Sequence, residues 1–112
     1  MTITNQEMSA YSFLKEMAED SYFPPRLVEK GQSILAGLCE SIEATKPTSL
    51  PELYALTHLA TEQFNVLGEE FEREGSEIET AARENIGSDI FEIAKAYGFA
   101  ADIEELIAQR EW

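Results

Sequence analysis

Hydrophobic residues recur at intervals of three and four along most of this chain, which is the spacing of one face of an α-helix. The clearest stripe lies between Ser49 and Gly75 and consists of Leu53, Leu56, Ala60, Phe64, Leu67 and Phe71. Ser49 and Glu52 have the spacing of a capping box, in which each side chain accepts a hydrogen bond from an unpaired backbone N–H. Gly75 can take the left-handed conformation that ends a helix. The pattern therefore predicts one long helix between these two residues.

A first helix is predicted near the N-terminus. Thr4 and Glu7 form another possible capping box, and the helix is expected to end near Asp20. Its apolar stripe consists of Ala10, Tyr11, Leu14, Met17, Ala18 and Tyr22. The sequence Phe23-Pro24-Pro25 stops it, because a residue before proline avoids the helical region.

A second helix is predicted from Pro25, since proline suits the first helical position, to Lys46. Its buried face consists of Leu27, Val28, Gly31, Ile34, Leu35, Leu38 and Ile42. Glycine is a poor helix former, so Gly31 within this face indicates a place where a neighbouring segment approaches closely.

The fourth helix is expected to begin at a capping box of Ser76 and Glu79 and to end at Gly98. Its stripe is Ile78, Ala82, Ile86, Ile90, Ile93 and Tyr97. Asp89 falls on this apolar face and Phe91 falls off it, so we predict a kink or a restart at Gly87-Ser88 that re-aims both.

A carboxylate on an apolar face needs a reason of its own. Asp89 is either a carboxyl with a raised pKa or the partner of a base such as Lys95 or Arg83.

A short closing helix is predicted after Asp102, which forms a capping box with Glu105 and precedes Ile103, Leu106 and Ile107. No segment shows the alternation of a strand. The sequence therefore predicts an all-α fold: an antiparallel bundle of four main helices plus a short C-terminal helix, forming a single domain over residues 1–112.

Composition supports one self-sufficient core. The chain has 112 residues, of which 44% are hydrophobic, and a chain of this length buries enough surface to fold without disulfides or a metal. The single cysteine, Cys39, fits a reducing compartment. The N-terminus lacks the pattern of a signal peptide, and the apolar run Ile34–Cys39 is too short to span a bilayer. We therefore expect a cytoplasmic protein.

Charge narrows the choice of partner. The net charge is −14, which argues against nucleic acid and anionic membranes and favours a basic partner or simple solubility. Residues 69–84 contain seven acidic and two basic residues. We interpret this cluster either as a solvated face or as a surface that binds a basic protein. The predicted partner-binding residues are Glu62, Glu69, Glu70, Glu72, Glu74, Glu77, Glu84, Tyr54 and Trp112.

Other candidate chemistry is sparse. His58 lies one turn before Glu62 on the predicted third helix, so the pair is either an ordinary surface pair or, with Glu69, part of a metal site. Cys39 as a nucleophile would need a nearby base, and packing in the core is the simpler interpretation. No G-x-S-x-G motif or phosphate-binding glycine loop is present. We expect no enzyme activity, no cofactor and no bound metal.

Several segments resemble a family of small acidic bacterial proteins of unknown function: Tyr54–Thr57, Gly75–Glu79, Ala94–Phe99 and Asp102–Ile107. The likeness covers most of the chain from Tyr22 onward and implies a bacterial origin. In size and charge, the chain is also similar to immunity proteins, which neutralise toxins delivered by rival cells.

The leading hypothesis is a non-catalytic helical module whose acidic surface binds a basic protein, most sharply an immunity protein that covers the active site of a nuclease toxin. Two alternatives stay open. One is a metal-binding helical bundle built on His58, Glu62 and Glu69. The other is a self-assembling structural protein that forms a homodimer through its flat helical faces.

Overall fold

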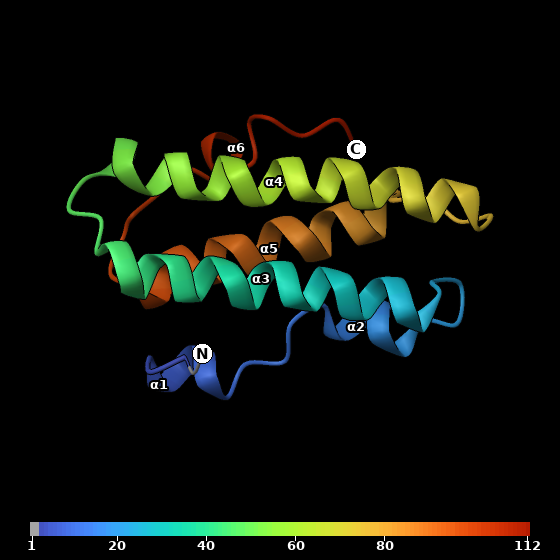
Figure 1. Cartoon of the computed structure of the whole chain (residues 1–112), viewed down its shortest axis with the longest axis horizontal. Coiled ribbons are helices and arrows are strands. Elements are labelled where there is room, and N and C mark those ends of the chain that lie inside the picture. Colours follow the sequence, from blue (N-terminus) through green and yellow to red (C-terminus); the bar gives the residue numbers. More distant parts are fainter. Residues whose placement is uncertain (1–2) are drawn as a thin grey trace.

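The computed structural model describes residues 3–112, which contain α-helices and no strands (Figure 1). The predicted all-α bundle with a short C-terminal helix is confirmed, but the first predicted helix is present as two short pieces. The helices are α1 (Gln6–Ser9), α2 (Lys15–Glu19), α3 (Pro25–Thr45), α4 (Leu50–Arg73), α5 (Thr80–Ala96) and α6 (Ile103–Leu106).

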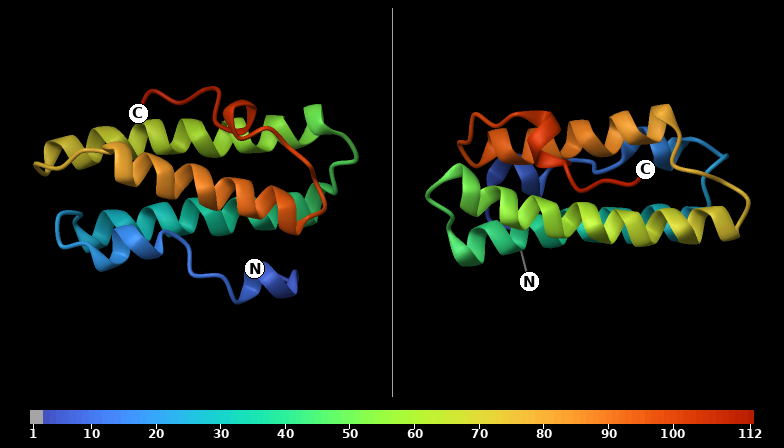
Figure 2. Two further views of the ribbon diagram at one scale, coloured as in Figure 1. Left: turned by 180° about the vertical axis from the view of Figure 1, so that it is seen from behind. Right: turned by 90° about the horizontal axis from the view of Figure 1, so that it is seen from above.

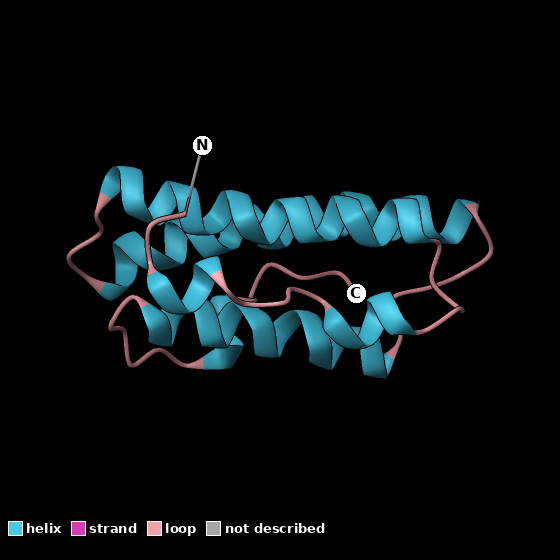
Figure 3. Cartoon of the chain, turned by 90° about the horizontal axis from the view of Figure 1, so that it is seen from below, coloured by secondary structure: helices cyan, strands magenta, loops and turns pink. Residues whose placement is uncertain are grey.

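The helices form two layers (Figures 2 and 3). One layer is the antiparallel hairpin of α3 and α4, the two longest helices. The other consists of α5 with α1 and α2 beside it, and α6 contacts both α5 and α4. The molecule measures 40 × 26 × 20 Å. Within residues 3–112, no helix is both long and apolar enough to cross a membrane.

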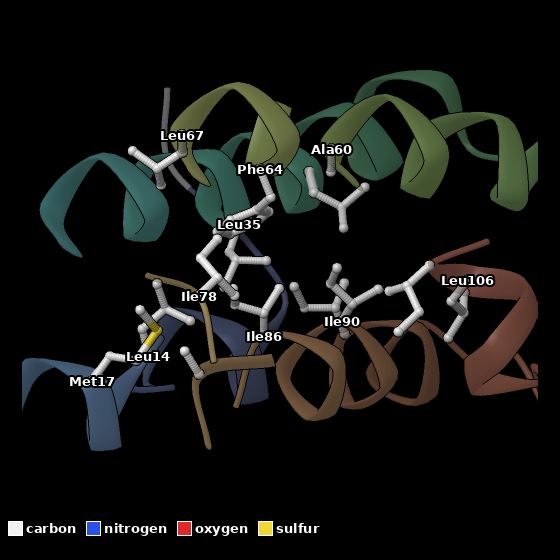
Figure 4. Close-up of a cluster of buried hydrophobic side chains, with 14 of the residues drawn as sticks. Leu14, Met17, Leu35, Ala60, Phe64, Leu67, Ile78, Ile86, Ile90 and Leu106 are labelled. Atoms are coloured by element: carbon white, nitrogen blue, oxygen red, sulfur yellow. The ribbon is translucent and has the colours of Figure 1, made fainter. Parts of the chain in front are cut away.

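The core fills the space between the layers (Figure 4). Phe64 of α4 points toward Ile86 of α5, beside which Ile90 lies; Leu67 of α4 enters the core at the end near α2, and Leu106 of α6 closes the other end. These five side chains are at most 2% exposed. Most residues of the predicted stripes of the second, third and fourth helices therefore lie where the layers meet, whereas Ile34 and Leu56 are only partly buried and lie between α3 and α4.

Two helix ends follow the local sequence. The Ser49 hydroxyl accepts a hydrogen bond from the Glu52 N–H at 3.4 Å, which confirms the predicted start of α4. Gly75 has φ +86°, and Gly98 has φ +89°. Each glycine lets the next residue's N–H return to a carbonyl of the last helical turn, as Ser76 does to Phe71 at 3.0 Å.

Two predicted capping boxes are wrong. The fourth helix starts at Thr80 rather than after Ser76, because the Ser76 N–H is already used to close α4. The chain then stays extended, which brings the buried Ile78 against Gly68 of α4. In α1 the cap is Asn5 rather than Thr4, and its side chain accepts from the Met8 N–H at 3.0 Å.

Asp89 explains why the first helix is broken. The helix α5 runs without interruption through Gly87-Ser88, so the predicted restart is wrong and Asp89 stays on the buried face. Its partners are neither Lys95 nor Arg83: one oxygen accepts from the Leu14 N–H at 2.6 Å and the other from the Tyr11 hydroxyl at 2.8 Å.

Leu14 reaches this contact by taking a left-handed conformation, φ +53°, which no continuous helix allows. One turn earlier on α5, the Asn85 oxygen accepts from the Met17 N–H at 3.2 Å. Two side chains of α5 therefore supply the cap that α2 lacks in its own sequence. Burial raises the pKa of Asp89, and the two hydrogen bonds partly oppose that shift.

A second carboxylate, Glu43 of α3, holds the N-terminal segment. It accepts from the N–H groups of Thr4 and Asn5 at 2.9–3.0 Å and from the hydroxyl of Tyr97. The Tyr97 hydrogen bond, followed by that from the Thr4 N–H, lowers the pKa of Glu43 to about 2.

We predict that Glu43→Gln weakens the docking of α1, because an amide offers one acceptor oxygen where the carboxylate offers two. The Met8 amide, which is part of α1, should exchange with solvent faster in the variant. The stabilisation from Glu43 is present above its ordinary pKa of 4.5 and is lost as pH falls toward about 2. The wild type should therefore lose its advantage over Glu43→Gln in that range.

Glu29→Gln, at an exposed position of the same helix, is the control. If Glu29→Gln accelerates exchange at Met8 as much as Glu43→Gln does, the Glu43 contacts do not hold the segment.

Candidate functional site

The C-terminal segment is held along α4 by polar side chains of that helix. Asn65 makes two hydrogen bonds to its backbone: the amide N–H donates to the Gln109 carbonyl at 3.0 Å, and the amide oxygen accepts from the Glu111 N–H at 2.7 Å. These two hydrogen bonds hold the backbone of Gln109 and Glu111 against α4 and thereby set the position of Trp112. The rings of Trp112 and Phe64 pack in a T-shaped arrangement, with 6.3 Å between centroids.

His58 and Thr61 hold the same segment one to two turns earlier. His58 Nε2 lies 2.7 Å from the Glu105 carbonyl oxygen, which requires that this nitrogen carries the proton. The Thr61 hydroxyl lies 3.4 Å from the carbonyl of Leu106. His58 therefore contacts α6 and is not placed as a partner of Glu62.

A groove of about 750 Å³ opens where the C-terminal segment, α4 and the α4–α5 connection meet. We call it the acidic groove. Its lining consists of Glu62, Asn65, Val66, Gly68, Glu69 and Glu72 from α4, Glu77 and Ile78 from the connection, and Glu111 and Trp112 from the C-terminal segment. Five of these ten residues are glutamates, and none is basic.

The predicted site residues divide between this groove and other surfaces. The groove brings together Glu62, Glu69, Glu72, Glu77 and Trp112, all of which were predicted. It also includes Glu111, which sequence reasoning missed. No local pattern marks Glu111, because its place depends on the contact between its backbone and Asn65.

Two predicted carboxylates lie on the opposite side of α4 and are already paired. Glu70 accepts from Lys30 at 2.6 Å, and Glu74 pairs with Arg26. Both partners belong to α3, and the hydrogen bond from Lys30 lowers the pKa of Glu70. The predicted grouping of all these glutamates on one surface is therefore wrong for this pair, because α3 and α4 are antiparallel and bring the bases at the start of one to the acids at the end of the other.

Glu84 and Tyr54 also lie outside the acidic groove. Glu84 is exposed on α5. Tyr54 is partly buried near the start of α4, where its ring stacks on His58 with 6.1 Å between centroids and its hydroxyl lies 3.4 Å from the Asp102 N–H. Tyr54 thus packs against the C-terminal segment and is not an anchor next to the acidic residues.

The remaining candidate residues have structural surroundings. Cys39 is fully buried in the core, and burial raises the pKa of its thiol to about 12. A thiol of this kind is not a ready nucleophile. Among residues 3–112, no three His, Cys, Asp or Glu side chains are grouped so that they could hold a metal ion.

The acidic groove combines unpaired charge with an apolar wall. The salt bridges within residues 3–112 are Arg26–Glu74, Lys30–Glu70 and Arg110–Glu104, and none includes a glutamate of the groove. Glu62 and Glu72 lie ten residues apart on α4, with Glu69 between them, so the three span about 15 Å along the helix axis. Trp112, half-buried, supplies aromatic surface at one side.

Comparison with known proteins finds one family. The family described as "Family of unknown function (DUF5713)" matches residues 7–112. No curated protein and no solved structure matches the chain.

Proposed function

Because this chain belongs to DUF5713, a family of unknown function, we infer its function from its own surface and propose that it is a non-catalytic module that binds a basic protein through the acidic groove. The observation that carries this proposal is the gathering of five unpaired glutamates and Trp112 in one groove. Acids that serve the fold, such as Glu43 and Asp89, lie elsewhere and have partners.

Charge and aromatic surface have different roles in such binding. Exposed ion pairs contribute only about 0.2–1 kcal/mol each, so the glutamates mainly attract and orient a basic partner. A tryptophan that loses solvent on contact supplies much of the lifetime of a complex. The groove lining has no histidine, cysteine, serine or lysine that could act as nucleophile or base beside these carboxylates, which supports a binding role.

The sharpest form of the proposal is an immunity protein that covers the basic active site of a nuclease toxin. Its glutamates would occupy the positions of nucleic-acid phosphates. The charge of −14 and the length of 112 residues fit that form. It predicts that a neighbouring gene encodes the toxin.

The test is binding to the basic protein encoded next to this gene, followed by the fluorescence of Trp112. Trp112 is the single tryptophan of the chain, so its emission reports directly on the groove. We expect the double variant Glu69→Gln/Glu72→Gln to weaken binding about tenfold at low salt. Wild-type binding should also weaken as salt rises from about 50 to 500 mM, because screening shortens the reach of charge.

The matched control is Glu70→Gln/Glu74→Gln, which removes the same charge from the same turns of α4 on the side paired with α3. It should leave the affinity nearly unchanged. Equal losses in the two double variants, or binding indifferent to salt, would contradict a role for the acidic groove.

A further inference from the structure

The face of α3 and α4 that points away from α5 has no cover among residues 3–112 (Figures 1 and 2). A second groove, of about 410 Å³, runs between the two helices on this side. We call this surface the hairpin face. Its lining residues are all uncharged: Ser33, Ile34, Gly37, Leu38, Ser41, Leu56, Leu59, Ala60 and Gln63. Because 27% of the residues of the chain are charged, an uncharged surface between two amphipathic helices differs from the rest of the molecule.

The hairpin face contains both a projection and a space. Leu59 is 60% exposed, although it is a large apolar side chain in the middle of a long helix. Gly37, on the facing helix, leaves open space: a Cβ added there would meet no atom within 4 Å. A neighbouring molecule with a projecting apolar side chain would therefore find room at Gly37, and Leu59 is such a side chain.

We propose that the hairpin face pairs with the hairpin face of a second copy, so that Leu59 of each copy packs at Gly37 of the other. A two-fold interface uses the same patch on both molecules and must therefore complement itself. The hairpin face meets this condition because the projection and the space belong to one groove. In the resulting dimer, the two α3–α4 hairpins pack against each other in the middle, and the two layers that contain α5 lie on the outside.

Charge favours a second copy over other partners. Two chains of −14 repel each other wherever their unpaired acids meet, so a homodimer needs a contact surface with few unpaired charges. The hairpin face is that surface, and at one end the pairs Lys30–Glu70 and Arg26–Glu74 neutralise the charges that border it. A basic partner would find no carboxylate to pair with along this groove.

The available area is also sufficient. The broad side of the molecule measures 40 by 26 Å. A specific interface of standard size buries about 800 Å² on each partner, so the contact would cover most of this side and include the Lys30–Glu70 and Arg26–Glu74 pairs beside the groove. The acidic groove lies across α4 from the hairpin face, and pairing leaves most of its glutamates open to solvent.

The experiment compares oligomeric state by sedimentation equilibrium of the full chain over about 1–200 µM, a range suited to dissociation constants in the micromolar region. We expect the wild type to form a dimer and Leu59→Glu to raise its dissociation constant at least tenfold. The control, Ala81→Glu, adds the same charge at an exposed position of α5 in the other layer and should leave the dimer intact. Circular dichroism verifies that each variant folds.

A second variant tests the space rather than the charge. Gly37→Leu places a side chain in the groove of its own molecule, where its Cβ meets no atom within 4 Å, and should block the entry of the partner's Leu59. Higher salt should strengthen the dimer, because screening weakens repulsion between the two acidic chains. Higher salt is expected to have the opposite effect on a basic partner, whose binding to the acidic groove it should weaken. The dimer and the binding of a basic partner can therefore fail or succeed separately.

Three results would overturn the pairing of hairpin faces. One is a wild type that stays monomeric over the whole concentration range. Another is a dimer that persists unchanged in both Leu59→Glu and Gly37→Leu. The third is a dimer that Ala81→Glu disrupts as strongly as Leu59→Glu does.

Discussion

Replacing Asp89 with alanine is expected to lower the free energy of unfolding by about 3 kcal/mol. The buried N–H of Leu14 would lose the acceptor that it meets at 2.6 Å, and the Tyr11 hydroxyl would lose its partner at 2.8 Å. An unpaired buried donor costs about 1–3 kcal/mol, and the space left by the carboxyl adds to that cost. Urea unfolding followed by circular dichroism measures the change.

The isosteric variant Asp89→Asn is the control, because its amide oxygen can still accept from Leu14. We expect its stability at neutral pH to stay within about 1 kcal/mol of the wild type, since the amide also avoids burying a charge. An alanine variant as stable as the asparagine variant would show that the hydrogen bond to Leu14 contributes little.

The pH dependence of the same pair has a definite sign. Burial raises the pKa of Asp89 in the folded state above the ordinary value of 3.8. Protonation is thus favoured by folding, so the wild type should gain stability relative to Asp89→Asn as pH falls through the folded-state pKa toward 3.8. The gain should disappear as pH rises again. Glu43 acts in the opposite direction over its own range, because its pKa is lowered.

Replacing Gly31 with alanine is expected to lower the free energy of unfolding by about 2 kcal/mol. A Cβ at this position would lie 2.6 Å from Leu14 Cδ1 and 3.2 Å from Phe64 Cε1. Leu14 cannot easily move aside, since it is 1% exposed and its backbone is fixed by Asp89. The strain therefore exceeds the benefit, about 0.5–1 kcal/mol, that alanine usually brings to a helix.

Gly37→Ala is the matched control on the same helix. A Cβ at Gly37 meets no atom within 4 Å, so this variant should gain about 0.5–1 kcal/mol. The two substitutions are chemically identical and should change the urea midpoint in opposite directions. If both variants were stabilised, the close approach at Gly31 would have no energetic consequence.

Several features that depend on neighbouring residues were predicted correctly from the sequence. The helix start at Ser49, the ends at Gly75 and Gly98, and the close approach at Gly31 each follow from a short pattern or a single residue type. The all-α fold follows from the spacing of apolar residues in the same way.

Apart from the Ser76–Glu79 capping box, which fails for a local reason, the wrong predictions about the helices concern features that distant residues decide. The break in the first helix depends on Asp89, which lies 75 residues after Leu14. A residue that looked out of place on its own helix is the cap of another, and no local rule identifies that partner. The kink predicted at Gly87-Ser88 gives Asp89 a local reason, whereas its partners Tyr11 and Leu14 lie far away in the chain and α5 runs on as one helix.

Part of the candidate site could be predicted from the sequence. The high density of acidic residues between residues 69 and 84 is evident from the sequence. The role of each acid on α4, however, depends on the side of the helix on which it lies. Glu70 and Glu74 are one turn apart, as are Arg26 and Lys30, and antiparallel helices bring these ends together. That signal could have separated the paired acids from Glu69 and Glu72. The place of Glu111 in the acidic groove and the position of Trp112 depend on the hydrogen bonds between the C-terminal segment and Asn65, so they could not be predicted from the sequence.

The Asp89 contact has a consequence for the order of folding. The hairpin of α3 and α4 is formed by segments adjacent in the chain, so it closes a short loop and can assemble early. Residues 11–17 also contact α3, where Gln32 donates to the Phe13 carbonyl, but the side chains that cap α2, Asn85 and Asp89, are near the other end of the polypeptide. We therefore expect α2 to take shape only after α5 has docked. On a ribosome, the segment synthesised among the first would be among the last to reach its native place.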